Sequence, residues 1–130
     1  MSREDRFTTR VKKYSKGDII FNEGNTSDGL YLIKTGRVRV FKRVYTKGRI
    51  VEYELAQLGV NNIFGEMALL GECTRTASVR ALTSTTCMRI SKNVFEQHIS
   101  KLPHWVHTVI KNLVIRLDET NNRLKTELEK

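Results

Sequence analysis

The most informative run of this sequence reads Phe64-Gly-Glu-Met-Ala-Leu-Leu-Gly-Glu-Cys-Thr-Arg-Thr-Ala-Ser-Val-Arg-Ala81. Gly65 lets the backbone come close to a ligand, because glycine carries no Cβ. Residues 66–69 can form one helical turn, whose free N–H groups bind anions. Nine residues after Glu66, Arg75 offers a planar fork for two phosphate oxygens. The run therefore predicts a phosphate-binding site at the mouth of a strand.

The acidic residue in this run, Glu66, indicates that the ligand contains a sugar. A carboxylate repels a phosphate, so an acidic residue beside a phosphate site is expected to bind another part of the ligand. A sugar hydroxyl is the natural partner, because acidic residues bind ribose hydroxyls in dinucleotide-binding folds. The small residues Thr76 and Ala77 leave room for something bulky. Phosphate and ribose together indicate a nucleotide, so Glu66 and Arg75 are the first candidates for binding residues.

At this point the run resembles the phosphate-binding cassette of cyclic nucleotide-binding domains. This family includes bacterial catabolite activator proteins, cyclic-nucleotide-dependent kinases and cyclic-nucleotide-gated channels. Its pattern, F-G-E-(L/M)-A-L followed by R-(A/T/S)-A-x-V, is met at residues 64–69 and 75–79. Upstream, Phe21-x-Glu-Gly24, Asp28-Gly-Leu-Tyr-Leu-Ile33 and Gly36 are similar to the early strands of the family. The resemblance covers roughly residues 10 to 130.

The resemblance implies a role for each matching residue. Glu66 would bind the ribose 2′-hydroxyl and Arg75 the cyclic phosphate. Backbone N–H groups around Ala68 and Ala77 would complete the phosphate cradle, with Gly65 allowing the approach. Thr76 would line the pocket near the phosphate or base. The ligand-binding residues expected from the cassette are Gly65, Glu66, Met67, Ala68, Arg75, Thr76 and Ala77.

The identity of the base is less firmly indicated. Thr76 is similar to kinase sites that prefer cGMP, although some channels with the same Arg-Thr-Ala triplet prefer cAMP. The run Arg116-Leu-Asp-Glu-Thr-Asn121 is similar to the R-L-x-x-T-S of the activator protein, whose Thr and Ser reach the adenine from two subunits. Thr120 and Asn121 are therefore candidate base contacts, and we expect cAMP rather than cGMP.

The rest of the sequence predicts a mainly β domain followed by helices. Short runs with strand character occur at residues 18–21, 30–33, 37–41, 49–55, 77–81 and 85–90. The runs at 30–33 and 37–41, joined through a glycine, predict a hairpin. Many short strands favour a β-roll or jelly roll, with strand signals from about residue 10 and no long N-terminal helix. We expect the β-roll domain at residues 1–100, with the cassette at 64–79.

Two helices are predicted after the strands, with Ser91 as the N-cap of the first, at 93–99. Pro103 suits the first turn of the second, which would run to Lys130. Its heptad stripe consists of Ile110, Val114, Leu117, Asn121, Leu124 and Leu128, the seam of a two-stranded coiled coil. We expect the first two turns to dock on the domain and the rest to form a parallel homodimer. Residues 101–130 would be the lid and dimerisation helix.

Composition and charge limit the classes of function. The chain has 130 residues, 39% hydrophobic and 28% charged, which suits one packed domain. Its formal charge of +9 favours phosphorylated partners. No apolar run has signal or membrane-spanning length, so we expect a cytoplasmic protein without a membrane span. Residues 34–49 carry seven basic side chains and no acid. This run would be the solvated face of a hairpin or a docking surface for an acidic partner.

Other classes of function fit less well. A cupin-type metal site needs histidines on strands, whereas His98, His104 and His107 lie in the helical tail, and Cys73 and Cys87 have no metal-binding spacing. No metal and no catalytic residue are expected, and no recognition-helix pattern supports direct binding of nucleic acid. The sequence predicts a cyclic nucleotide sensor that relays binding through its C-terminal helix to an effector domain outside this chain. A dimerisation module of the same fold without a ligand is the alternative.

Overall fold

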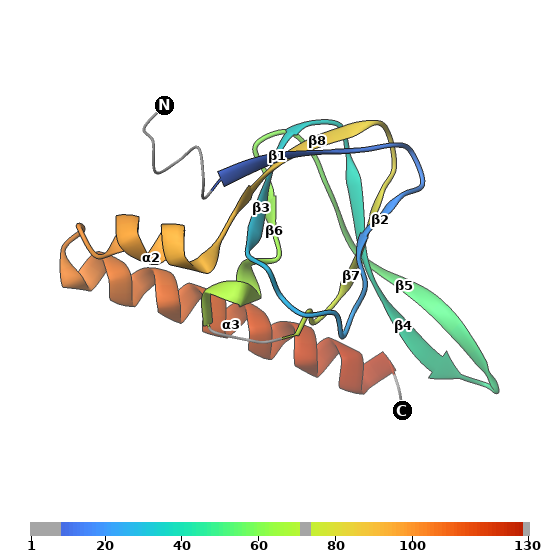
Figure 1. Ribbon diagram of the computed structural model, residues 1–130. Helices are drawn as coiled ribbons and strands as arrows, with labels where there is room; N and C mark the ends of the chain where they lie inside the picture. Colours follow the sequence, from blue (N-terminus) through green and yellow to red (C-terminus); the bar gives the residue numbers. More distant parts are fainter. Residues whose placement is uncertain (1–8, 71–73, 129–130) are drawn as a thin grey trace.

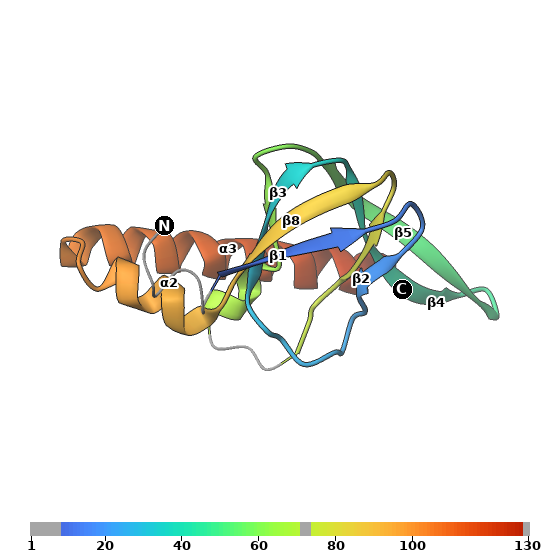
Figure 2. The ribbon, with the colours of Figure 1, turned by 45° about the horizontal axis from the view of Figure 1, so that its top comes forward.

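A computed structural model of the chain describes residues 9–70 and 74–128, and its strands form two antiparallel sheets (Figures 1 and 2). The first sheet has the order β1 (Thr9–Tyr14), β8 (Thr85–Ile90), β3 (Leu30–Thr35), β6 (Ile63–Phe64). The second has the order β2 (Ile19–Phe21), β7 (Ser78–Ala81), β4 (Val38–Thr46), β5 (Arg49–Leu58). The helical elements are η1 (Glu66–Leu70), a 3-10 turn, α2 (Lys92–Ile99) and α3 (His104–Leu128). The predicted fold class, a mainly β roll followed by a short and a long helix, is confirmed.

The hydrophobic core is formed by both sheets. Tyr31, Ile33 and Cys87 come from the first sheet and Val38 and Val79 from the second, and all are at most 4% exposed. Their side chains point to the interior at every second position, as expected for strands with one buried face. Burial raises the pKa of the Cys87 thiol to about 11, so it is an unreactive part of the core. Cys73 lies outside the described residues.

The predicted hairpin between residues 30–33 and 37–41 is wrong. β3 pairs with β8 and β6, whereas β4 pairs with β5 and β7, so the two strands belong to different sheets. Gly36, with φ of +94°, makes the crossing between them. A Cβ at this glycine would lie 2.4 Å from the carbonyl oxygen of Ser84. The glycine marks a tight passage between two sheets rather than a hairpin turn.

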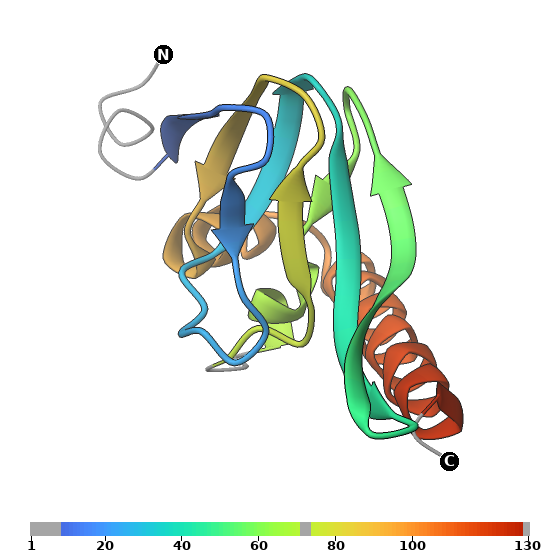
Figure 3. The ribbon, with the colours of Figure 1, turned by 90° about the vertical axis from the view of Figure 1, so that its right-hand side faces the viewer.

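The true hairpin is formed by β4 and β5, which project from the body of the domain (Figures 1 and 3). Its two-residue turn is Lys47-Gly48, with φ of +52° and +80°, as a type I′ turn requires. The run at 34–49 is therefore not one solvated hairpin face. Lys34 belongs to β3, Arg39 pairs with acidic residues of β5, and Lys42 is buried.

The helices follow the prediction closely. The side chain of Ser91 accepts a hydrogen bond from the N–H of Val94, so Ser91 is the N-cap of α2. α3 passes along η1 and the β4–β5 hairpin (Figure 3). Val114 is 7% exposed and packs with Leu30 and Met67. Docking on the domain thus reaches at least to Val114, beyond the two turns expected.

The coiled-coil dimer stays a prediction. Trp105, Val109 and Leu113 of α3 are exposed in the single chain. The side chains of Asn121, Leu124 and Leu128 lie outside the described ones. Among the helices that the structure describes, none is long and apolar enough to cross a membrane.

Candidate functional site

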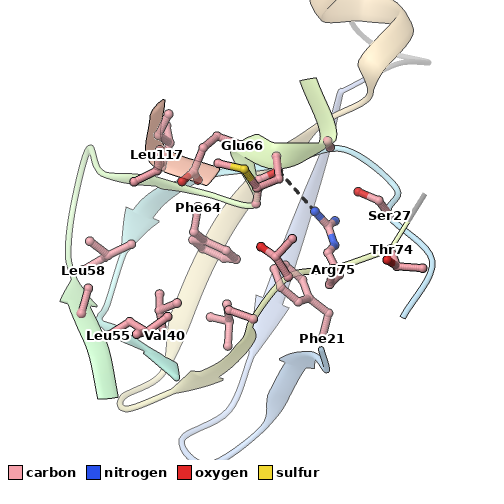
Figure 4. Close-up of a pocket in the computed structure, with 18 residues that line it drawn as sticks. Phe21, Ser27, Val40, Leu55, Leu58, Phe64, Glu66, Thr74, Arg75 and Leu117 are labelled. Carbon is pink, nitrogen blue, oxygen red and sulfur yellow. Dashed lines mark hydrogen bonds between the residues drawn. The ribbon is translucent and has the colours of Figure 1, made fainter. Parts of the chain in front are cut away.

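A cavity of about 300 Å³ opens between the cassette, the second sheet and α3 (Figure 4). One side is apolar and includes Val40, Leu55, Leu58, Phe64, Val79 and Leu117. The other side is polar and includes Ser27, Glu66, Thr74, Arg75 and Thr76. A bulky ligand with an apolar part and an anionic part matches such walls. Every residue predicted from the cassette, Gly65, Glu66, Met67, Ala68, Arg75, Thr76 and Ala77, lines this cavity.

Arg75 is the main charged group of the cavity, although it is only 4% exposed. Its guanidinium lies 4.0 Å from the centre of the Phe21 ring, and Nη1 donates to the carbonyl oxygen of Gly65 at 3.3 Å. Among the described residues, buried side-chain atoms without a hydrogen-bond partner are the Nε atoms of Arg75 and Arg89. A buried donor without an acceptor is costly, so the free Nε of Arg75 is suited to donate to an anion.

Asp28 holds Arg75 from the other side. Its Oδ1 lies 2.5 Å from Nη2 of Arg75, and its carboxylate also accepts from the hydroxyl of Tyr31 at 3.2 Å. Nη1 of Arg89 lies 3.8 Å from Oδ2 of Asp28. Burial, with the neighbouring Asp28 carboxylate, raises the pKa of Tyr31, so its hydroxyl stays protonated and donates. The cluster fixes the position of the Arg75 guanidinium.

Gly65 is where the backbone comes closest to this arginine. Its φ is +77°, and a Cβ would lie 2.7 Å from Nη1 of Arg75. A larger residue would therefore displace the guanidinium. The close approach of this backbone to a ligand stays a prediction; in this structure the backbone of Gly65 comes close to Arg75.

Glu66 begins η1 and shares the cavity with Arg75. Burial raises the pKa of the Glu66 carboxyl, while its own backbone N–H and the charge of Arg75 act in the opposite direction. The N–H of Ala68, a predicted phosphate donor, donates to the carbonyl oxygen of Gly65 at 3.2 Å. It thus closes the 3-10 turn in this structure. The same largely apolar cavity is thus lined by an acceptor, Glu66, and by a buried cation, Arg75.

The comparison with known families agrees with this geometry. A family model described as "Cyclic nucleotide-binding domain" matches residues 11–101. The chain belongs to this family.

Three relatives illustrate the range of this cyclic nucleotide-binding domain. The Cyclic AMP receptor protein of Thermus thermophilus is 36% identical over 111 residues, 85% of this chain and 50% of that protein. The cGMP-dependent protein kinase of Plasmodium berghei is 35% identical over 91 residues, 69% of this chain and 10% of the kinase. The cAMP-bound structure of the EAL enzyme Bd1971 has a TM-score of 0.71 and 32% identity, covering 91% of this chain and 31% of that one. The chain spans about half the length of the first curated relatives it matches.

The predicted base contacts lie farther along α3 than the cavity. Among the α3 side chains that the structure describes, Leu117 lines the cavity. Thr120 is exposed, and its hydroxyl donates to the carbonyl oxygen of Arg116 at 3.0 Å. The side chain of Asn121 is outside the described ones. Contacts from Thr120 and Asn121 to a base, including contacts from a second subunit, stay predictions.

Several residues of the cyclic nucleotide-binding domain's site were not predicted as site residues. Phe21, Asp28 and Tyr31 come from quoted family motifs, but nothing local in the sequence connects them with Arg75, which lies 47 residues after Asp28. Leu117 was interpreted only as part of the dimer seam. Within residues 9–70 and 74–128, no three side chains of His, Cys, Asp or Glu gather as ligands for a metal ion.

Proposed function

We propose that this domain binds a cyclic nucleotide, cAMP in preference to cGMP, and regulates an attached or associated effector without performing chemistry on the ligand. One observation carries the proposal: Arg75, a buried cation with a free Nε, shares an otherwise largely apolar cavity with Glu66. A cyclic nucleotide has one anionic phosphate, a ribose hydroxyl and a flat base, which match these three features. Arg75 would bind the phosphate, Glu66 the 2′-hydroxyl, and the apolar wall the base.

The preference for cAMP rests on relatives and on α3. The Thermus thermophilus relative is named for cyclic AMP, whereas the Plasmodium berghei kinase is cGMP-dependent. The EAL enzyme Bd1971 was solved with cAMP and also with cGMP bound, so it supports binding of a cyclic nucleotide without favouring either. Thr76 lines the cavity and could serve either base. Thr120 and Asn121 would favour adenine if α3 moves, or if a second subunit presents them.

Regulation would act through α3. Leu117 lies on the cavity wall, and Val114, one turn before it, packs on Met67 of the cassette. Because both contacts adjoin the nucleotide site, a bound base would favour one position of the helix over another. The ligand can shift this equilibrium only by its difference in affinity for the two states. In this proposal the helix then reports binding to the effector and pairs with a second copy.

Titration calorimetry with cAMP and with cGMP tests the binding proposal. We expect saturable binding, tighter for cAMP. Arg75→Leu should lower the affinity at least a hundredfold, because one charged anchor of the phosphate is lost and bonds to charged groups contribute about 1.5–3 kcal/mol each. Arg37→Leu, which removes an exposed arginine, is the matched control and should bind as the wild type does. The absence of saturable binding to either nucleotide at concentrations up to about 1 mM would contradict the proposal, because this is well above the dissociation constant of about 40 µM that corresponds to about −6 kcal/mol.

Sedimentation with and without nucleotide distinguishes the proposed nucleotide sensor from the alternative, a dimerisation module without a ligand. A dimer that forms equally well in the absence and presence of nucleotide, in a protein that binds neither cAMP nor cGMP, would favour the ligand-independent dimerisation module. A dimer that strengthens with nucleotide supports the relay through α3.

A further inference from the structure

Lys42 of β4 is a buried lysine that the site described so far does not use. Its side chain is 2% exposed, whereas a lysine is almost never fully buried unless its ammonium group is bonded. Nζ donates to the carbonyl oxygen of Thr76, in the cassette. Glu23 lies nearby, with its Oε2 3.9 Å from Nζ.

The bond lies where the pairing of β4 with β7 ends. That ladder runs from Val38↔Ala81 to Phe41↔Ser78, and the chain then bends at Thr76 and Ala77. A bend takes its peptide groups out of the ladder, so the carbonyl of Thr76 needs another donor. The ammonium of Lys42 is that donor. The Lys42 side chain thus supplies the hydrogen bond to Thr76 at the point where the backbone pairing of β4 and β7 ends.

The preceding peptide group is held from a different segment. The carbonyl oxygen of Arg75 accepts from the N–H of Gly24 at 2.8 Å, and the N–H of Arg75 donates to the carbonyl oxygen of Asn25 at 2.8 Å. The peptide bonds of the described residues are trans, so each carbonyl and the following N–H point in opposite directions. Gly24 therefore sets the direction of the Thr76 N–H, and Lys42 sets the direction of the Ala77 N–H.

We propose that Lys42 is a positioning residue for nucleotide binding: it holds the bend at residues 76–77 so that the main-chain N–H groups there meet the phosphate. This inference rests on the proposed function. Thr76 and Ala77 line the cavity, while Lys42 acts from behind them. Its charge also polarises the peptide group that it bonds, which strengthens the N–H at the other end as a donor. A neutral side chain of equal length would fill the same space, but it would neither hold the bend by a hydrogen bond nor polarise the peptide group.

Calorimetry on four proteins tests the role of Lys42. The wild type is titrated first, and whichever of cAMP and cGMP it binds more tightly is then used for Lys42→Met, Lys42→Arg and the control Lys34→Met. We expect Lys42→Met to bind at least tenfold more weakly and Lys42→Arg to stay within about threefold of the wild type, since arginine keeps a charged donor. Lys34 is an exposed residue of β3, so its variant has the same change in charge and should bind normally.

Amide NMR separates positioning from general loss of structure. In the wild type, the Thr76 and Ala77 amide protons should move downfield when nucleotide is added, as expected for new hydrogen bonds to an anion. In Lys42→Met these shifts should shrink, while the amide signals in the rest of the domain keep their wild-type positions. If Lys42→Met does not fold, Lys42→Gln replaces it, because glutamine is polar, uncharged and too short to reach in the same way.

The outcomes distinguish this inference from the proposed function. A wild type that binds neither nucleotide overturns both. A wild type that binds, together with a folded Lys42→Met or Lys42→Gln of unchanged affinity and unchanged Thr76 and Ala77 shifts, overturns the role of Lys42 alone. Equal weakening by Lys42→Met and Lys42→Arg also overturns it, because positioning by a charged donor requires rescue by arginine.

Discussion

Arg75 illustrates at the scale of one residue how a buried charge can be prepared for a ligand. Two aromatic rings, the carboxylate of Asp28 and the carbonyl of Gly65 hold its guanidinium. A side chain that is already ordered loses little conformational freedom when a phosphate binds. The cost of burying the charge is met by folding, so more of the phosphate interaction remains available for affinity.

Gly65→Ala should weaken nucleotide binding at least tenfold. The new Cβ would lie 2.7 Å from Nη1 of Arg75, and the φ of +77° adds strain of about 1–2 kcal/mol. Gly48→Ala is the matched control, because Gly48 has a φ of +80° with no atom within 4 Å of a Cβ. Both variants should lose similar stability in thermal unfolding, while calorimetry shows lost affinity only for Gly65→Ala. Equal affinities for both variants would contradict the packing argument.

Nucleotide affinity should fall at acid pH because of Glu66. In the proposed complex a ribose hydroxyl would donate to the Glu66 carboxylate, so the bound state would favour the charged form and have a lower Glu66 pKa than the free protein. The affinity for the nucleotide is then highest above the pKa that Glu66 has in the free protein, and it declines as the pH falls through this pKa. Because burial raises this pKa, the decline begins at a higher pH than for an exposed glutamate.

The measurement is a series of calorimetric titrations from neutral to acid pH, within the range where circular dichroism shows the domain folded. Glu66→Gln keeps the size of the side chain and should bind about tenfold more weakly, with a flatter pH profile. If the affinity of the wild type depended on pH as weakly as that of Glu66→Gln, Glu66 would not be the residue that binds the ribose hydroxyl.

At the scale of elements, the outer face of the β4–β5 hairpin is held by a cluster of ion pairs. Glu52 accepts from Arg39 at 2.9 Å and from Arg80 at 2.9 and 3.1 Å, and joins β5 to β4 and β7. The guanidinium groups of Arg39, Arg43 and Arg80 lie about the ring of Phe41, at 4.8 to 5.2 Å from its centre. Three of the seven basic residues at 34–49, Arg39, Lys42 and Arg43, are therefore engaged in ion pairs within the fold.

This cluster makes the stability of the domain sensitive to acid. Hydrogen bonds from Arg80 and Arg39 lower the pKa of Glu52 from 4.5 to about 2. The folded-state pKa is the lower one, so the stabilisation is present above pH 4.5 and is lost as the pH falls towards 2. The thermal midpoint should fall over this interval, by less in Glu52→Gln. The effect should shrink in high salt, since the side chain of Glu52 is one-third exposed.

Glu54→Gln serves as the comparison for Glu52→Gln. Glu54 pairs with Arg39 alone of the three arginines, and its side chain is more exposed. Glu54→Gln should therefore change the dependence of the thermal midpoint on acid pH less than Glu52→Gln does. An identical profile for the wild type and Glu52→Gln would show that the cluster contributes nothing to acid stability.

At the scale of the whole molecule, the two sheets, η1 and α3 enclose one site together. A ligand that touches all four parts should stabilise the native state as a unit, because it binds the folded and not the unfolded chain. At a cAMP concentration a hundred times the dissociation constant, the gain is about 2.7 kcal/mol. For a domain of this size that corresponds to a rise in the thermal midpoint on the order of 10 °C.

Differential scanning calorimetry with cAMP, cGMP and 5′-AMP measures this effect. The open-chain 5′-AMP carries the same base with a different phosphate geometry and should stabilise the domain much less than cAMP does. Equal rises for cAMP and 5′-AMP would indicate binding of the base alone, and the cyclic phosphate would lose its role in recognition.

The cassette could be predicted from the sequence because its chemistry is local. Gly65, Glu66 and Arg75 lie within eleven residues, and glycine, carboxylate and guanidinium each have a narrow range of uses at such a site. Ser91 as an N-cap was also predictable, since its bond spans three residues. The pairing of β3 was not, because its partners β6 and β8 lie about 30 and 55 residues away and a glycine between two strands also suits a hairpin turn.

The sequence by itself determined the class of the fold, the family and the cassette residues that line the cavity, because these depend on residue types at short and regular spacing. Only the tertiary structure decided that Asp28 and Phe21 hold Arg75, that Lys42 bonds the bend at Thr76, and that Leu117 borders the cavity. Each of these contacts joins segments more than thirty residues apart in the chain. The packing of the two sheets on each other and of α3 on the cassette brings these segments together. A local sequence pattern does not indicate which distant segments will meet.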